Sequence, residues 1–196
     1  MFMLISFQSS TNSVTVETSK PKLVDDHDVI VRVAGSTVCG SDVHLMHGVV
    51  IQVERGDILG HEFCGVVDSI GPAVTHLNVG ERVVNSFVIS CGTCRFCKQN
   101  LTTACEKTNS STLHEQLYGS RMGGIFGYSH FTGGYAGGQA EYVRVPLGEQ
   151  NLLKLPDSMP FEKGQYTKSL SHLNTFTDQF RTLPVRCPSY FIPQRL

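Results

Sequence analysis

Short runs rich in valine and isoleucine recur along the chain, each bounded by Gly, Pro, Asn or Ser. The clearest are DVIVRVAGS (28–36), FCGVVDSIG (63–71), ERVVNSFVIS (81–90) and QAEYVRVP (139–146). β-Branched residues in such runs, punctuated by turn-forming residues, are typical of strands. Because no long segment with a helical period separates them, the pattern predicts a mainly β fold, a barrel or a sandwich, and not a doubly wound sheet.

Two segments depart from the strand pattern. SDVHLMHG predicts one short helix, with Ser41 as its N-cap and Gly48 as its stop. The stretch 119–138 holds eight glycines and predicts a folded surface loop. A phosphate cradle is disfavoured there, because no part of the chain contains G-x-G-x-x-G and no convincing helix follows the glycines.

The pattern changes after about Lys163. Residues 164–196 show neither a clean helical nor a clean alternating period, and three prolines lie in the last thirteen residues. Sequence without a period has no face to bury against a core. We therefore divide the chain into one domain, residues 1–163, and a divergent, poorly ordered tail, residues 164–196.

Composition and charge exclude several classes of function. The chain has 196 residues, 40% hydrophobic and 17% charged, as in a folded globular protein. Its net charge of −1 offers no electrostatic footprint for nucleic acid or for a membrane surface. The N-terminus lacks the features of a signal peptide, and no run approaches membrane-spanning length. An odd number of cysteines, seven, then predicts a reducing compartment, by default the cytoplasm.

Four of the seven cysteines lie within fifteen residues. They are Cys91, Cys94, Cys97 and Cys105. The spacing C-x2-C-x2-C-x7-C lets one short lobe wrap four thiolates around a tetrahedral Zn²⁺, and Gly92 allows the tight turn after the first ligand. An iron–sulfur cluster also uses four cysteines, but its ferredoxin-type spacings differ from this one. Four free buried thiols are the remaining alternative.

A second candidate metal site lies upstream, in TVCGSDVHLMHG and GDILGHEFCGVV. Cys39, His61 and Glu62 offer a thiolate, an imidazole and a carboxylate, a mixture found in open catalytic zinc sites. Each also has an ordinary interpretation, since a single cysteine is usually a small buried apolar residue and His-Glu pairs are common on surfaces. The residue types alone leave both interpretations open.

The order of these motifs resembles that of the medium-chain zinc-dependent alcohol dehydrogenases. CGSDVH, GHEFCGVV, the four-cysteine lobe and GGQAEYVRVP follow one another within residues 14–163. GGIFGYSHFTGGYAGGQAEYVRVP further resembles the branch that contains glutathione-independent formaldehyde dehydrogenases. The resemblance implies a GroES-like, partly open β-barrel with a zinc-binding lobe, followed by a Rossmann domain that binds NAD(P). It also implies oxidoreductase activity on a small alcohol or aldehyde.

The resemblance assigns metal ligands residue by residue. Cys39 and His61 match ligands of a catalytic zinc, and Glu62 matches a carboxylate beside that metal that can enter its coordination sphere. Cys64 and Cys187 match no ligand position, and we expect Cys64 to belong to the core and Cys187 to the tail.

The same resemblance assigns three further roles near the catalytic zinc. Ser41 matches the hydroxyl that receives the alcohol proton, and His44 matches the outer end of the proton relay. Asp42 matches an acid that orients the ligand histidine. In the family the zinc acts as a Lewis acid on the alcohol, and a hydride leaves for nicotinamide.

The sequence departs from the family near LPDSMPFEKG (155–164). Relatives continue there into a segment with a third protein ligand and then into the Rossmann domain, whereas GQYTKSLSHLNTF offers no matching Asp, Glu or Cys. We therefore expect a truncated member with a firmly held structural zinc, a weakly held catalytic zinc, and no NAD(P) binding or turnover by the isolated chain. The alternative is a non-catalytic zinc-binding remnant with a structural or dimerising role. Whether the chain forms a homo-oligomer stays open.

Overall fold

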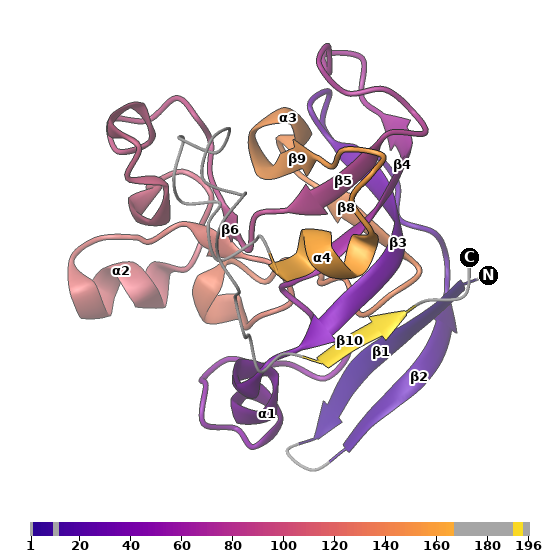
Figure 1. Ribbon diagram of the computed structural model, residues 1–196. Helices are drawn as coiled ribbons and strands as arrows, with labels where there is room; N and C mark the ends of the chain where they lie inside the picture. The colour runs from indigo at the N-terminus through magenta and orange to yellow at the C-terminus, as the bar shows by residue number, and fades with distance from the viewer. Residues whose placement is uncertain (1, 10–11, 167–189, 194–196) are drawn as a thin grey trace.

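The computed structural model of the chain describes residues 2–9, 12–166 and 190–193. Strands dominate, as the sequence pattern predicts (Figure 1). The strands are β1 (Phe2–Ser9), β2 (Asn12–Thr18), β3 (Val29–Val38), β4 (Phe63–Ile70), β5 (Arg82–Asn85), β6 (Val88–Ile89), β7 (Gly124–Ile125), β8 (Tyr142–Val145), β9 (Leu152–Lys154) and β10 (Tyr190–Pro193). The α-helices are α1 (Gly40–Met46), α2 (Thr112–Tyr118), α3 (Gly148–Asn151) and α4 (Phe161–Tyr166), and the 3-10 turns are η1 (Cys97–Gln99), η2 (Thr102–Ala104) and η3 (His130–Thr132).

The main sheet is built around β3. Strand β4 pairs along one edge of β3, while β8 and β10 share the other edge, β8 beside residues 29–32 and β10 beside residues 35–38. Strands β5 and β9 extend the sheet beyond β4. All pairings between strands of the described residues are antiparallel. The register of β3 against β4 shifts at two places, and such bulges bend a sheet toward a barrel.

The hydrophobic core lies between this sheet and the glycine-rich segment 119–138. β3 is buried along nearly its whole length, which explains its continuous apolar run. Phe63 at the start of β4 packs edge-to-face on Phe126, with ring centroids 5.4 Å apart. The remaining fully buried members come from the strands. They include Val29, Val31, Val67, Val83, Ile89, Val143 and Val145.

Helix α1 follows β3 directly and carries part of the candidate site (Figure 1). Gly48 ends it as predicted, with a positive φ of 69° that suits glycine. The predicted N-cap was wrong by two residues, because the cap position is Cys39 and Ser41 lies in the first turn. The Asp42 carboxylate, at the third helical position, accepts the N–H of the N-cap residue Cys39 at 2.7 Å, as the N3 acid of a capping box does.

The glycine-rich segment is less exposed than a surface loop. Gly127 and Gly137 are buried against Leu59 and Gly60, and the N–H of Gly137 donates to the Ile58 carbonyl at 2.8 Å. A Cβ on Gly137 would lie 2.3 Å from the Leu59 carbonyl oxygen, so only glycine fits there. The glycines therefore bring this segment against the backbone just before His61.

Much of the predicted tail, residues 167–189 and 194–196, lies outside the described residues, and so does Cys187. Of the rest, residues 164–166 complete α4, and β10 pairs with β3. The division into residues 1–163 and 164–196 stays a prediction. No helix among the described residues is both long and apolar enough to cross a bilayer.

Candidate metal centres

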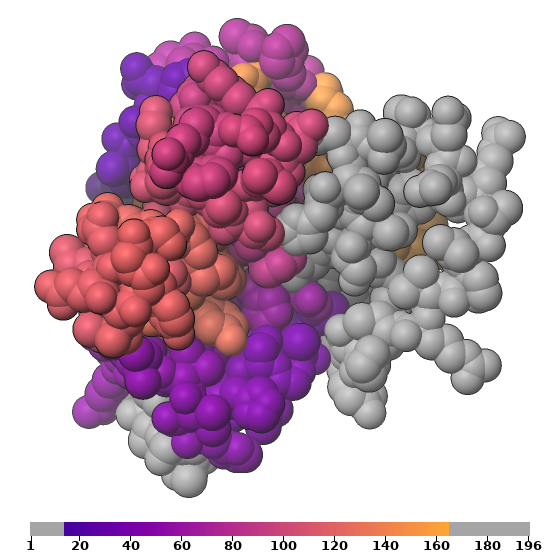
Figure 2. All heavy atoms as spheres, turned by 90° about the vertical axis from the view of Figure 1, so that its left-hand side faces the viewer, coloured from indigo at the N-terminus to yellow at the C-terminus, as the bar shows by residue number. Residues whose placement is uncertain are grey.

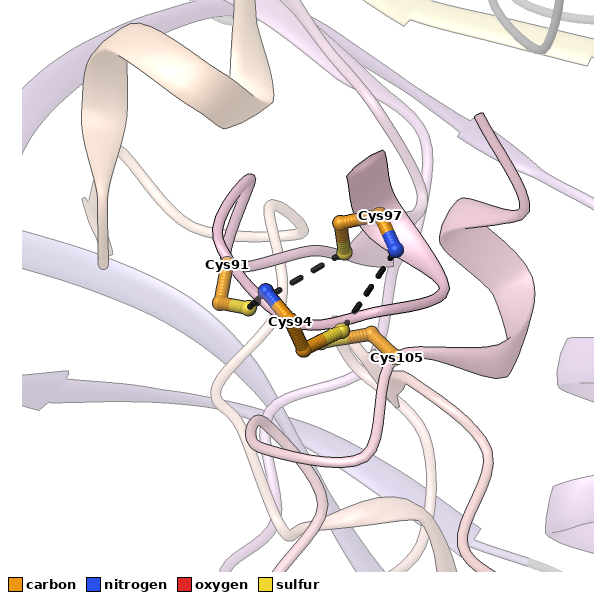
Figure 3. A group of neighbouring side chains, drawn as sticks. All are labelled: Cys91, Cys94, Cys97 and Cys105. Atoms are coloured by element: carbon orange, nitrogen blue, oxygen red, sulfur yellow. Dashed lines mark hydrogen bonds between the residues drawn. The ribbon is translucent and has the colours of Figure 1, made fainter. Parts of the chain in front are cut away.

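The four-cysteine lobe brings all four of its sulfurs together (Figure 3). Each sulfur lies within 4.8 Å of the other three, and Cys91 Sγ is 3.9 Å from Cys97 Sγ. Tetrahedral zinc with Zn–S bonds of about 2.3 Å requires sulfurs about 3.8 Å apart. A disulfide would require about 2.05 Å, and the cysteines are free. The lobe therefore fits one Zn²⁺.

Local backbone geometry builds the lobe. The N–H groups of Thr93 and Cys94 donate to Cys91 Sγ at 3.4 and 3.3 Å, and the N–H of Cys97 donates to Cys94 Sγ at 3.4 Å. Gly92 has a φ of 69°, as the predicted tight turn requires. These three hydrogen bonds join residues 91–97 to one another, so local backbone geometry positions the first three cysteines. Figure 2 shows the lobe above the segment that contains α2, on one face of the molecule.

The same contacts favour thiolates. Burial opposes ionisation of Cys91, but hydrogen bonds from the Thr93 hydroxyl and N–H and from the Cys94 N–H lower its pKa to about 6. Burial likewise opposes ionisation of Cys94, yet N–H donors from Cys97 and Glu106 lower its pKa. Burial raises the pKa of Cys97 to about 12, and its contact with Cys94 adds to this. A divalent cation supplies the positive charge that complete ionisation of the cluster needs.

The second site joins two segments far apart in the sequence. Cys39 lies at the junction of β3 and α1, and His61 and Glu62 immediately precede β4. Their ligand atoms lie within 4.8 Å of one another. The Glu62 carbonyl accepts the Thr37 N–H at 3.0 Å, and this backbone hydrogen bond holds the two segments in register.

The two nitrogens of the His61 ring face different groups. Nε2 lies 3.8 Å from Glu62 Oε1 and 3.3 Å from the Ser41 hydroxyl, while Nδ1 lies 3.7 Å from Asp42 Oδ1. The ring is 7% exposed. A ligand histidine commonly directs one nitrogen at the metal and the other at a carboxylate. Nε2 is therefore the nitrogen on the side of Glu62 and Ser41.

The donor set fits zinc. A thiolate, an imidazole and a carboxylate are three protein ligands of the kind that open zinc sites use, with a fourth position left for water or substrate. The backbone around His61 is fixed as well, because the Asn85 side-chain amide donates to the His61 carbonyl at 3.0 Å and accepts from the Phe63 N–H at 2.8 Å. Cys39, His61 and Glu62 could therefore hold a catalytic metal.

The remaining predicted residues differ in how close they lie to the second site. Ser41 and Asp42 touch the site, whereas His44 lies on the exposed face of α1. Cys64 is fully buried and packs with Val84 and Leu155, as expected of a core residue. The roles of Ser41, Asp42 and His44 in catalysis remain predictions.

Sequence reasoning missed three residues around the second site. The Thr37 hydroxyl donates to Glu62 Oε2. The rings of Phe87 and Tyr128 stand edge-on to His61, with centroids 6.5 and 6.0 Å from its own. Burial raises the pKa of Tyr128, and the nearby Asp42 and Cys39 raise it further. The signal that could have identified Thr37 is a hydroxyl residue inside a buried strand, two positions before a candidate ligand.

Zinc-type dehydrogenases are among the known proteins that this chain resembles. A zinc-type alcohol dehydrogenase-like protein of Schizosaccharomyces pombe is 44% identical over 79% of this chain and 37% of its own length. The glutathione-independent formaldehyde dehydrogenase of Pseudomonas aeruginosa is 42% identical over 70% of this chain and 33% of its own. Among solved structures, the alcohol dehydrogenase TADH from Thermus sp. ATN1 superposes with a TM-score of 0.75 and 34% identity, over 85% of this chain and 43% of that one.

The chain thus spans between 33% and 43% of the length of these relatives. The model of the alcohol dehydrogenase GroES-like domain matches residues 25–157, which include β3, both candidate metal centres and the glycine-rich segment. The mainly antiparallel sheet and its cysteine lobe agree with that fold, so the predicted fold class is confirmed. The chain belongs to the zinc-dependent alcohol dehydrogenase family and carries its GroES-like domain.

Proposed function

We propose that this chain binds two zinc ions and forms the alcohol-binding part of a zinc-dependent alcohol or aldehyde dehydrogenase. The observation that carries the proposal is the convergence of Cys39, His61 and Glu62, from two separate segments, within 4.8 Å of one another. The four-cysteine lobe would hold the second, structural ion. Both relatives named above, a zinc-type alcohol dehydrogenase-like protein and a formaldehyde dehydrogenase, support a small alcohol or aldehyde as substrate.

Each residue around the second site has a chemical task in this proposal. Zinc held by Cys39, His61 and Glu62 would supply a Lewis acid for the oxygen of an alcohol or aldehyde. The Ser41 hydroxyl, 3.3 Å from His61 Nε2, lies where it can accept a proton from a substrate hydroxyl. His44 follows three residues later on α1 and is exposed, so it can pass the proton to solvent.

The aromatic side chains define the apolar part of the site. Phe87 and Tyr128 cover two sides of the buried His61 ring and keep water from it. An alcohol with its oxygen at the ligand cluster would therefore place its carbon chain against these rings. A small alcohol or aldehyde fits such a site better than a charged substrate.

Hydride transfer also needs a nicotinamide ring held against the substrate carbon. The residues assigned here hold the metal and the substrate oxygen, and in this family a Rossmann domain holds NAD or NADP. We therefore propose metal binding without turnover for the isolated 196-residue chain, in the cytoplasm. The second candidate function is a non-catalytic zinc-binding module, favoured by the four-cysteine lobe, whose ligands are complete without the second site.

The experiment is metal analysis of the purified chain with titration of cofactors and substrates. We expect two zinc ions per chain, of which a mild chelator removes the one at Cys39 and His61 first. Cys39→Ser and His61→Ala should each abolish that ion and leave the other. Calorimetry with NAD and NADP should show no binding, and absorbance assays on formaldehyde and ethanol no turnover.

The outcomes separate the alternatives. One zinc per chain, unaffected by His61→Ala, would favour the non-catalytic module. Saturable cofactor binding, or turnover abolished by His61→Ala, would show that the isolated chain is a dehydrogenase by itself.

A further inference from the structure

Two hydrogen bonds join Thr37 and Glu62. Thr37 lies on β3, two residues before Cys39, and is 4% exposed. Its N–H donates to the Glu62 carbonyl at 3.0 Å, and its hydroxyl donates to Glu62 Oε2. One residue therefore fixes both the backbone and the carboxylate of Glu62.

The hydrogen bond from the Thr37 hydroxyl gives the two carboxylate oxygens of Glu62 different partners. Oε2 accepts from Thr37, while Oε1 lies 3.8 Å from His61 Nε2, the nitrogen on the side of the ligand cluster. A glutamate side chain has three rotatable bonds, and the conformational entropy lost when a metal fixes them opposes binding. This cost is smaller when the folded chain has already restricted the bonds. The Thr37 hydroxyl restricts them before a metal arrives and leaves Oε1 on the side of His61 Nε2.

We propose that Thr37 is a positioning residue that holds Glu62 as the third protein ligand of the metal at Cys39 and His61, bound through Oε1 alone. The inference rests on the proposed function of this site. It explains why a buried strand carries a hydroxyl at this position, since a buried hydroxyl needs a partner and here the partner is a ligand carboxylate. It also supplies a third protein ligand from within residues 2–166.

Zinc affinity at the second site, measured by competition with a chromophoric chelator in chains whose four-cysteine lobe is filled, tests the proposal. Thr37→Val removes the hydroxyl at nearly constant shape and should weaken zinc binding there roughly tenfold to hundredfold. Thr37→Ser keeps the hydroxyl and should bind nearly as the unchanged chain does. Thr37→Ala gives a second test should valine not be accommodated.

Two further variants distinguish a specific effect on the Glu62 carboxylate from a general destabilisation of the site. Ser36→Ala removes the neighbouring buried hydroxyl, which donates to the Glu62 carbonyl at 2.8 Å and not to its carboxylate. This matched control should leave zinc affinity within about threefold, which is less than 1 kcal/mol. In a Glu62→Ala background, Thr37→Val should cause no further loss. With Co²⁺ as the probe, Thr37→Val and Glu62→Ala should alter the visible spectrum of the second site in the same way.

Each outcome decides the matter. A chain without any second zinc overturns the proposed function and the inference together. A second zinc whose affinity is unchanged by Thr37→Val and Thr37→Ala overturns the inference alone. Thr37 would have only a structural role if Thr37→Val lowered zinc affinity equally with and without Glu62. The same would follow if Ser36→Ala lowered zinc affinity as much as Thr37→Val.

Discussion

Asp42 Oδ1 lies 3.7 Å from His61 Nδ1, and both side chains are buried. The other oxygen of the same carboxylate accepts the Cys39 N–H at 2.7 Å. One carboxylate therefore faces the histidine ring and also holds the backbone N–H of the cysteine. We therefore expect a substitution at Asp42 to affect both candidate ligands.

We expect Asp42→Ala to weaken zinc binding at Cys39 and His61 roughly tenfold to hundredfold, as loss of a carboxylate behind a ligand histidine commonly does. The same change removes the cap of α1 and should lower the free energy of unfolding by about 1 kcal/mol. Chelator competition and denaturant unfolding measure the two effects. Asp157→Ala, at an exposed position, is the matched control. Unchanged zinc affinity in Asp42→Ala would contradict the assignment.

The four-cysteine lobe predicts a contrast between two buried cysteines. Cys97→Ser should remove one zinc ion per chain and lower the melting temperature, because a structural zinc stabilises the fold it binds. Cys64→Ser should remove none. Burial and the nearby Glu162 raise the pKa of Cys64 to about 12, and its thiol faces the Gly35 carbonyl oxygen, so it stays protonated. Metal analysis of both variants decides this, and full zinc content in Cys97→Ser would refute the prediction.

Glu81 gives a pH-dependent contribution to stability. Hydrogen bonds from Lys154 and then from Asn78 lower its pKa from an ordinary 4.5 to about 2. Because the folded-state pKa is the lower one, the contribution is complete above about pH 4.5 and is lost as the pH falls toward 2. Glu81→Gln should therefore be less stable than the unchanged chain at pH 7, and the difference should vanish near pH 2.

Denaturant unfolding of both proteins across this range, at low and at high salt, measures the difference. High salt should reduce it, since the group lies at the surface. In a Lys154→Met background, which removes the largest cause of the shift, the difference at pH 7 should shrink. A difference that persists unchanged down to pH 2 would show that Glu81 does not titrate as described.

Two ion pairs of the chain should differ in their contribution to stability. Asp28 is fully buried, and its carboxylate accepts two backbone N–H groups. Arg144 Nη1 also donates to both carboxylate oxygens, at 3.0 and 3.2 Å. Arg144→Met leaves that carboxylate buried without its cation and should lower the free energy of unfolding by about 1.5–3 kcal/mol. Lys20→Met breaks the exposed pair with Asp68 and should change it by about 1 kcal/mol or less. Equal effects in denaturant unfolding would contradict this ranking.

Local patterns determined much of the fold and one whole metal site. The valine-rich runs form β3, β4, β5 with β6, and β8. These strands could be predicted because a run of apolar residues is a local signal for a buried strand. The four cysteines lie within residues 91–105, and a short lobe of this kind can close on its own ligands. Elements as short as β9 and α3 have too few residues to be recognised from their period. Strand β9 pairs with β5, and Gln150 and Asn151 of α3 donate hydrogen bonds to Ser90.

Only the tertiary structure decided the second site. Cys39 can meet His61 and Glu62 only if β3 pairs with β4 in one register, because a slip by one residue would turn the side chains to the other face. The capping of α1 by Asp42 and the burial of the glycine-rich segment against Gly60 follow from the same packing. The contact between Thr37 and Glu62 joins residues far apart in the chain, and no local pattern of residues specifies which distant carboxylate a buried hydroxyl will meet.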